Sequence, residues 1–382
     1  MPQHGASSAN KIVPAPARAL ASRSAALVTR GLLDLARDSN WLIRKIFSGH
    51  TSRLALSSTG QLSAALPLAP NDTESIALYD IELGRPTVAL SVPGEKPNAR
   101  SALPVAFAWS STASDLVVAW QNWGSRLYAF DPHGEISLGG FGEFSAFPGH
   151  LAWSDSGKYL ASACSGAARA RVRLWEAAPH SNSGMPFAEP PLSEVGGPRS
   201  FEEWFDDDPL DTDSADESTF SGFGRIAFSP DEGTLASVIE IEGEWADDSI
   251  VLLDVPTLRR RATFQAQGHI TGLAWTFDGQ NLIHCSAGQA YRTSPISPEI
   301  ESLPFGAELV ACHPHLPVCL CFSSWLRSSA KGRLFLADLE RLSVFDEYAA
   351  EGVVDLRWSR DGSKAYAVTA DGLAYIYELP PL

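Results

Sequence analysis

One short pattern recurs along most of the chain and constrains the fold more than any other feature. An apolar run leads into a turn of Ser, Asp and Gly, and a second and a third apolar run follow. The intervals between successive copies are 53, 44, 75, 47, 37 and 46 residues, and most of them are close to the roughly 40–45 residues of a four-stranded repeat unit. The anchor residues of the seven copies are Leu56, Trp109, Trp153, Phe228, Trp275, Cys312 and Trp358.

The continuation of each copy predicts a small antiparallel sheet. The third apolar run ends in an acidic residue in six copies, as at Asp80, Asp254 and Glu378, whereas the copy at 269–306 has Arg292 there. Alternating residues after a tight turn are typical of half-buried strands. Such a sheet buries its faces only by stacking on its neighbours around an axis. The sequence therefore predicts an all-β fold, a seven-bladed β-propeller over residues 40–382.

Several dipeptides resemble the WD40-repeat family of propellers. Gly49-His50 and Gly268-His269 are similar to the Gly-His start of that repeat, and Trp175-Glu176 stands where its Trp-Asp signature falls. No true Trp-Asp occurs at the end of a third strand, and most copies lack Gly-His. The repeats are thus degenerate, and the hydrogen-bond network of His, Ser, Trp and Asp that is usual in the family is predicted for no blade. The resemblance bears on the fold, and as an indication of function it is nonspecific.

The ends of the repeat region predict how the ring closes. The last copy supplies three strands, near 353–358, 364–369 and 373–379. The segment 41–47 precedes the first inner strand, and we expect it to be the outer strand of the last blade. That pairing would leave no open sheet edge.

Residues 1–39 lie outside the repeat and are predicted to form a flexible tail followed by an amphipathic helix over 19–38. The helix packs on its own propeller, docks onto a partner through Leu27, Leu32 and Leu35, or is part of a targeting signal. Residues 1–33 contain four basic and no acidic residues, which is typical of a mitochondrial transit peptide. The expected location is cytoplasmic, with a mitochondrial location as the alternative.

The long interval of 75 residues predicts an insertion at 181–221. Its stretch 201–217 holds nine acidic and no basic residues, which is more than half of the net charge of −16. Such a run is commonly a solvated loop. Phe201, Trp204 and Phe205 beside the acids also suit a docking segment for a partner with a basic surface. A calcium site is the third interpretation, although the EF-hand spacing is absent.

Cysteine and histidine gather in one short stretch, with Cys312, Cys319 and Cys321 around His313 and His315. These residue types can bind zinc. In the register of the repeat, however, they fall on two strands and the turn between them, where thiols are commonly buried as small apolar groups. The sequence favours this structural role and predicts no metal and no cofactor. Five cysteines in so long a chain also do not make a disulfide framework.

The remaining features limit the function classes. The negative charge disfavours nucleic acid as a partner, no apolar run is long enough to span a membrane, and no common catalytic motif occurs. The predicted function is a noncatalytic scaffold for protein–protein interactions within a multi-subunit complex. The alternative is a propeller enzyme or small-ligand binder whose central channel carries convergent His, Asp and Arg side chains. Trp123 and Trp245 are secondary candidates for partner binding, whereas the tryptophans in repeat register belong to the core.

Overall fold

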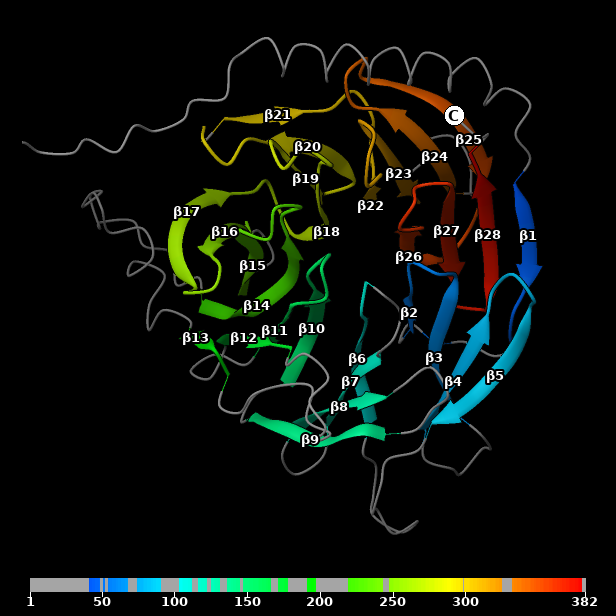
Figure 1. Ribbon diagram of the computed structural model, residues 1–382. Coiled ribbons are helices and arrows are strands. Elements are labelled where there is room, and N and C mark those ends of the chain that lie inside the picture. Colours follow the sequence, from blue (N-terminus) through cyan, green and yellow to red (C-terminus); the bar gives the residue numbers. More distant parts are fainter. Residues whose placement is uncertain are drawn as a thin grey trace, which may run out of the picture.

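The chain forms a seven-bladed β-propeller (Figure 1), and its described residues contain 28 strands, four in each antiparallel blade. Ser165 of blade 3 pairs with Gly222 of blade 4, so these two blades share one continuous sheet. The described residues contain no helix, and the predicted N-terminal helix lies outside them. The computed structural model describes residues 41–48, 51, 54–67, 74–90, 103–111, 116–121, 125–130, 136–144, 147–165, 171–177, 191–196, 219–242, 247–297, 299–324 and 332–379.

In blades 1 to 3 the strands run from the channel outward in chain order. Blade 1 consists of β2 (Leu54–Leu56), β3 (Gln61–Pro67), β4 (Glu74–Asp80) and β5 (Arg85–Leu90). Blade 2 consists of β6 (Leu103–Trp109), β7 (Leu116–Gln121), β8 (Ser125–Phe130) and β9 (Ile136–Phe144). Blade 3 consists of β10 (Phe147–Trp153), β11 (Tyr159–Ser165), β12 (Arg171–Glu176) and β13 (Ser193–Gly196).

Blades 4 to 6 follow the same plan, and blade 7 receives its fourth strand from the start of the repeat region. Blade 4 consists of β14 (Thr219–Phe228), β15 (Thr234–Glu242), β16 (Ser249–Asp254) and β17 (Arg259–Gln265). Blade 5 consists of β18 (Ile270–Trp275), β19 (Leu282–Ser286), β20 (Gln289–Thr293) and β21 (Ile300–Ser302). Blade 6 consists of β22 (Leu309–Cys312), β23 (Val318–Ser323), β24 (Arg333–Asp338) and β25 (Ser343–Ala349). Blade 7 consists of β26 (Val353–Trp358), β27 (Lys364–Thr369), β28 (Leu373–Glu378) and β1 (Leu42–Lys45).

Strand β1 confirms the predicted closure of the ring. It pairs antiparallel with β28, with Leu42 opposite Ile376 and Lys45 opposite Leu373. The predicted insertion at 181–221 also contains blade structure, because β13 and the first residues of β14 fall within that range. The repeat pattern did not identify β13, a short outermost strand without an anchor residue.

The turn after each inner strand has a recurring local cause. In blade 7 the Ser359 hydroxyl donates to Asp361 Oδ1 over 2.6 Å and accepts from the Lys364 amide at 2.8 Å, while Gly362 adopts a φ of 73°. The equivalent glycines in blades 1, 3 and 5 also have positive φ, a conformation that glycine adopts without steric penalty. Blade 4 has Glu232 at this place, with a φ of 57°.

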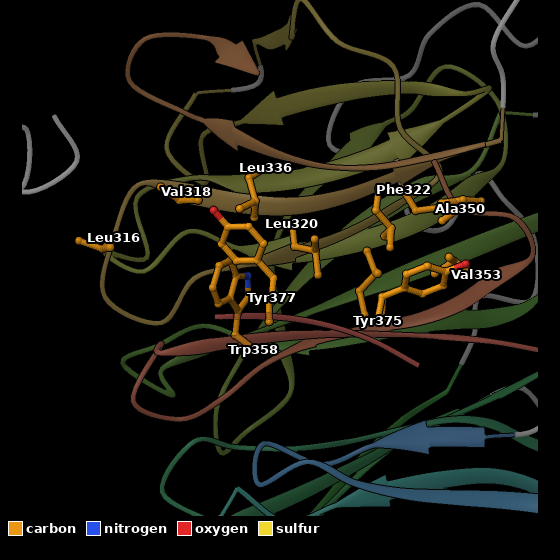
Figure 2. Packing of buried hydrophobic residues seen from close by; sticks show 14 residues of the cluster. Leu316, Val318, Leu320, Phe322, Leu336, Ala350, Val353, Trp358, Tyr375 and Tyr377 are labelled. Atoms are coloured by element: carbon orange, nitrogen blue, oxygen red, sulfur yellow. The ribbon is translucent and has the colours of Figure 1, made fainter. Parts of the chain in front are cut away.

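The hydrophobic core is divided among the interfaces between blades. The described residues form seven buried clusters, and each joins two neighbouring sheets. Figure 2 shows the cluster between blades 6 and 7, where Leu320 and Leu336 face Trp358 and Tyr377. Apolar burial stabilises a fold by roughly 25 cal/mol per Å². Since each blade buries its apolar side chains against its neighbours, the blades depend on one another for stability. The stacked blades place their inner strands around a central channel.

Candidate functional site

The candidate partner-binding residues from the sequence all lie outside the described residues. Their positions are therefore still predictions, and the structure neither brings them together nor separates them. They are Leu27, Leu32 and Leu35 in the N-terminal segment, Trp123 and Trp245 at positions predicted to be loops, and Phe201, Trp204 and Phe205 in the acidic stretch.

The repeated tryptophans belong to the core, as predicted, and they also join the blades. Trp109, Trp275 and Trp358 are buried, and Trp153 is half-buried. Each indole Nε1–H donates to the carbonyl of an alanine on the inner strand of the preceding blade. The four bonds are Trp109 to Ala55 at 3.3 Å, Trp153 to Ala108 at 3.2 Å, Trp275 to Ala227 at 3.0 Å and Trp358 to Ala311 at 2.9 Å.

The cysteine and histidine stretch forms the predicted strands and turn, β22 and β23. His313 is buried, its Nδ1 accepts from the amides of His315 and Leu316, and its Nε2 lies 3.0 Å from the Gly362 carbonyl in blade 7. Burial lowers the pKa of His313 to about 4, so the neutral ring is a structural link between two blades. Among the described residues, no group of three or more His, Cys, Asp or Glu side chains is placed to hold a metal ion.

A contact between a histidine and an aspartate lies at the step from blade 4 to blade 5. His269 Nδ1 lies 3.3 Å from Asp248 Oδ1, and the Asp248 carboxylate accepts from the Ile270 amide at 2.8 Å. This contact fixes the connection from β17 to β18.

The inner strands of the seven blades surround the axis of the ring (Figure 1). Their residues line a central cavity of about 870 Å³. Aligning the repeats places its lining residues in three rings. The first ring is Ala106, His150, Arg225, Gly272, Leu309 and Asp355. The second ring is Ala55, Ala108, Ala152, Ala227, Ala274, Ala311 and Arg357. The third ring, on the turns, is Ser58, Ser111, Asp155, Pro230, Phe277, Pro314 and Arg360.

Ionisable side chains of the first ring come from blades 3, 4 and 7, namely His150, Arg225 and Asp355. Burial, reinforced by the positive charge of Arg225, lowers the pKa of His150 to about 4. Burial also lowers the pKa of Arg225, while Asp355 across the channel acts in the opposite direction. At neutral pH His150 is therefore an uncharged hydrogen-bonding group beside a guanidinium.

Asp355 joins the last blade to the first. Its Oδ2 accepts from the Leu56 amide at 2.9 Å, and its Oδ1 accepts from the Leu356 amide at 2.9 Å. Burial raises the pKa of this carboxyl group, and the Leu56 hydrogen bond opposes that shift. Blade 1 has leucine in place of the repeated tryptophan, and the carboxylate supplies the bond between blades that an indole supplies elsewhere.

Charges also gather at the mouth formed by the turns. Desolvation of the carboxyl group raises the pKa of Asp155, whereas the positive charges of Arg357 and Arg360 act to lower it. The neighbouring Ser156 donates from its backbone amide and its hydroxyl to the Glu232 carboxylate, the hydroxyl over 2.7 Å. Glu232 thus links blade 4 to blade 3 from its left-handed turn position.

Ionisable side chains gather in the channel. His, Asp and Arg side chains converge on it from blades 3, 4 and 7. Within the described part of the chain, no two ionisable side chains among the channel-lining residues form a hydrogen bond or an ion pair with each other.

Sequence reasoning did not identify the channel residues, although their signal was present. Aligning the seven copies shows Leu-Ala-Trp in blades 3 and 5 where blade 7 has Leu356-Arg357-Trp358. An arginine among six alanines would have singled out Arg357. The link through Asp355 has no comparable signal, because it depends on the meeting of the first and last copies.

Comparisons with known proteins define the fold alone. No family model matches the chain, and no curated protein matches its sequence. Among solved structures 1455 chains match. One is a chain in the crystal structure of the Mitotic Checkpoint Complex, with a TM-score of 0.59 and 12% sequence identity, over 90% of this chain and 95% of that chain. Within the described part of the chain, no helix is long and apolar enough to span a membrane.

Proposed function

We propose that the protein is a noncatalytic, WD40-like scaffold that binds one or more proteins within a multi-subunit complex in the cytoplasm. The observation that carries this proposal is the seven-bladed propeller itself, similar over 90% of its length to a chain of a multi-protein assembly. Its ordered strands present loops at low entropic cost, which favours recognition by the rim. A mitochondrial location remains the alternative that the N-terminal sequence supports.

Blade 7 meets blade 1 at the seam where the ring closes. Exposed apolar side chains at this seam support a role in protein contacts. Leu42 and Ile43 on β1 are 46% and 40% exposed, and Leu83 in the turn between β4 and β5 is 56% exposed. The ion pair of Glu82 with Lys364, at 2.6 Å, holds this turn against blade 7. Apolar residues on a rim are typical of sites where another protein binds.

The acidic stretch 201–217 is the second element of the proposal. Its carboxylates would steer the protein toward a basic surface, and Phe201, Trp204 and Phe205 would supply the buried contacts. Charge and apolar contact make separable contributions, because the first governs the association rate and its salt dependence and the second governs dissociation.

The test is affinity purification from the native host with mass spectrometry. Full-length protein is compared with variants that lack 1–39 or 201–217. A matched pair separates the two contributions: one variant changes the three aromatics to serine, and the other changes the nine acids to their amides. We expect the aromatic variant to lose partners at all salt concentrations, whereas the loss caused by the amide variant should be largest at low salt and should fade as salt screens the charges. A Leu83→Ser variant tests the seam.

The outcome that contradicts the scaffold is failure of the full-length protein to recover any reproducible partner. Loss of the same partners with only one of the variants would assign the docking segment. Recovery of partners by every variant would retain the scaffold but remove the acidic stretch, the N-terminal segment and Leu83 from its binding surface.

A second candidate function is favoured by one observation, the charged channel. An enzyme or small-ligand binder that uses the channel was the alternative from the sequence, and His150, Arg225, Asp355 and Arg357 line it. Binding is the part of this alternative that the geometry supports best, and its ligand class can be derived from the channel residues.

A further inference from the structure

Arg357 is the exception in a ring of otherwise identical residues. The six other blades place alanine at its position, and all seven residues line the central cavity. Arg357 is exposed to this cavity. Its guanidinium carries five donors, yet no described residue forms a hydrogen bond or an ion pair with it. Because six alanines show that the fold accepts a methyl group here, packing gives no reason for the arginine.

The backbone around Arg357 is held rigidly. Next to it, Trp358 Nε1 donates to the Ala311 carbonyl at 2.9 Å. Three residues further on, the Arg360 amide donates to the Ser58 carbonyl at 3.4 Å, and His315 Nε2 lies 3.2 Å from the Arg360 carbonyl. Blades 1 and 6 thereby fix the main chain, whereas the side chain of Arg360 is exposed at the same mouth of the channel. The guanidinium groups of Arg357 and Arg360 are therefore exposed to solvent on one ordered hairpin, formed by β26 and β27.

The balance of charge in the channel is positive, although the whole chain carries −16. Three arginines, at 225, 357 and 360, line the cavity with two carboxylates, Asp155 and Asp355. Asp355 already accepts two backbone amides, so its charge is partly satisfied. The net positive charge lies inside low-dielectric walls, which concentrate the field within the cavity. A small anion would enter a locally favourable potential.

We propose that the central channel binds a small molecule through an oxyanion group, a carboxylate or a phosphate, held by Arg357 and Arg360 at the mouth formed by the turns. Planar guanidinium groups match both oxyanions with paired hydrogen bonds. A cavity of about 870 Å³ lies within the range of small-molecule sites. Asp155 interacts electrostatically with the two arginines and competes with the anion for them. Arg225 supplies positive charge deeper in the channel.

The repeat itself supplies the variants that test this site. Arg357→Ala restores the seventh alanine, and Asp155→Ser introduces the residue that blades 1 and 2 have at that ring position, so both are compatible with the fold. Arg259→Ala on β17 is the matched control, because it removes an exposed arginine outside the cavity lining. Titration calorimetry on the full-length chain at low ionic strength would use citrate as the carboxylate probe and pyrophosphate as the phosphate probe.

We expect the unaltered protein to bind at least one probe. Arg357→Ala should weaken binding by about tenfold or more, because a charged hydrogen bond contributes about 1.5–3 kcal/mol. Asp155→Ser should strengthen binding, since it removes the competing negative charge, and Arg259→Ala should leave binding unchanged. A response to citrate alone or to pyrophosphate alone would identify the oxyanion class.

Three results would overturn the proposal. The first is no binding of either probe by the unaltered protein. The second is equal weakening by Arg357→Ala and Arg259→Ala, which would mean attraction to surface charge in general. The third is weaker binding by Asp155→Ser. An unchanged thermal unfolding midpoint in Arg357→Ala shows that lost binding is not lost folding, and Arg357→Lys, which keeps the charge without the planar fork, should bind with intermediate affinity.

Discussion

The inner strands of blades 5 and 7 are built alike but line the channel differently. Each has a bulge near its start, and each carries a tryptophan that donates to the preceding blade. Each is also followed by a turn whose Ser or Thr hydroxyl donates to an Asp two residues on. The three ring positions differ, with Gly272, Ala274 and Phe277 in blade 5 and Asp355, Arg357 and Arg360 in blade 7. Stability and channel chemistry therefore use different residues of the same strand.

At the first ring position, one residue both lines the channel and contributes to the stability of the fold. In blade 5 a Cβ at Gly272 would lie 3.0 Å from the Glu308 carbonyl oxygen and 3.1 Å from Cys285 Sγ. Glycine suits this position because the backbone of blade 6 approaches closely, so that an added methyl group would require its neighbours to shift. In blade 7 the same position holds Asp355, whose carboxylate binds the Leu56 amide of blade 1. Packing selects the residue in one blade, and a specific hydrogen bond selects it in the other.

The largest expected effect tests what the two blades share. Trp358→Ala and Trp275→Ala should each lower the free energy of unfolding by about 3–5 kcal/mol, because a large buried side chain is removed. The matched substitutions to phenylalanine, the residue at this place in blade 4, should cost about 1 kcal/mol, mainly through loss of the indole hydrogen bond. Chemical denaturation followed by tryptophan fluorescence and circular dichroism measures both. Equal losses for alanine and phenylalanine would contradict the packing role.

An intermediate effect tests the close approach found in blade 5. Gly272→Ala should destabilise the protein by about 1–3 kcal/mol, because the added methyl group forces the backbone of blade 6 to move. The control is Gly149→Ala, in the inner strand of blade 3, where an added Cβ meets no atom within 4 Å. The control should be neutral or slightly stabilising. If both variants lose the same stability, the effect is not caused by contact with blade 6.

The smallest effect concerns Asp355 and is read from its pH dependence. Asn retains an acceptor for the Leu56 amide but cannot ionise. Because the folded protein raises the pKa of Asp355, ionisation disfavours the folded state, and protonation relieves this penalty. The stability of the unaltered protein relative to Asp355→Asn should therefore rise as the pH falls through the folded pKa toward the ordinary value near 3.9. Denaturation from pH 7 to pH 4 measures the difference, and a relative loss in this range would contradict the prediction.

The fold was predictable from the sequence because its strongest determinants are local and repeated. Tryptophan anchors, hydroxyl-bearing turns and acidic strand ends occur in register and identified the blades. The closure by β1 was predictable because the last copy supplies only three strands. The acidic ends also have a defined role, since Asp338 Oδ1 accepts the amides of Glu340 and Arg341 in the turn that follows β24.

The candidate site was predictable only in part, because it depends on contacts between copies. The Glu232 link from blade 4 to blade 3 replaces a glycine by a residue that is unfavourable in a left-handed turn, and the link of Asp355 to Leu56 joins the two ends of the repeat region. Neither has a local pattern. Arg357 is different, because comparison of the copies with one another reveals it.

The pairing of β1 with β28 has a consequence for the order of folding. Lys45 and Asp371, which form an ion pair at 3.5 Å, are 326 residues apart in the chain. During synthesis at roughly 5–20 residues per second, β1 leaves the ribosome well before its partner strand exists, and it must remain unpaired for tens of seconds. Its apolar Leu42 and Ile43 are open to other chains throughout that interval. Among the described strands, the strand that closes the finished ring is thus the one that waits longest for its pairing partner.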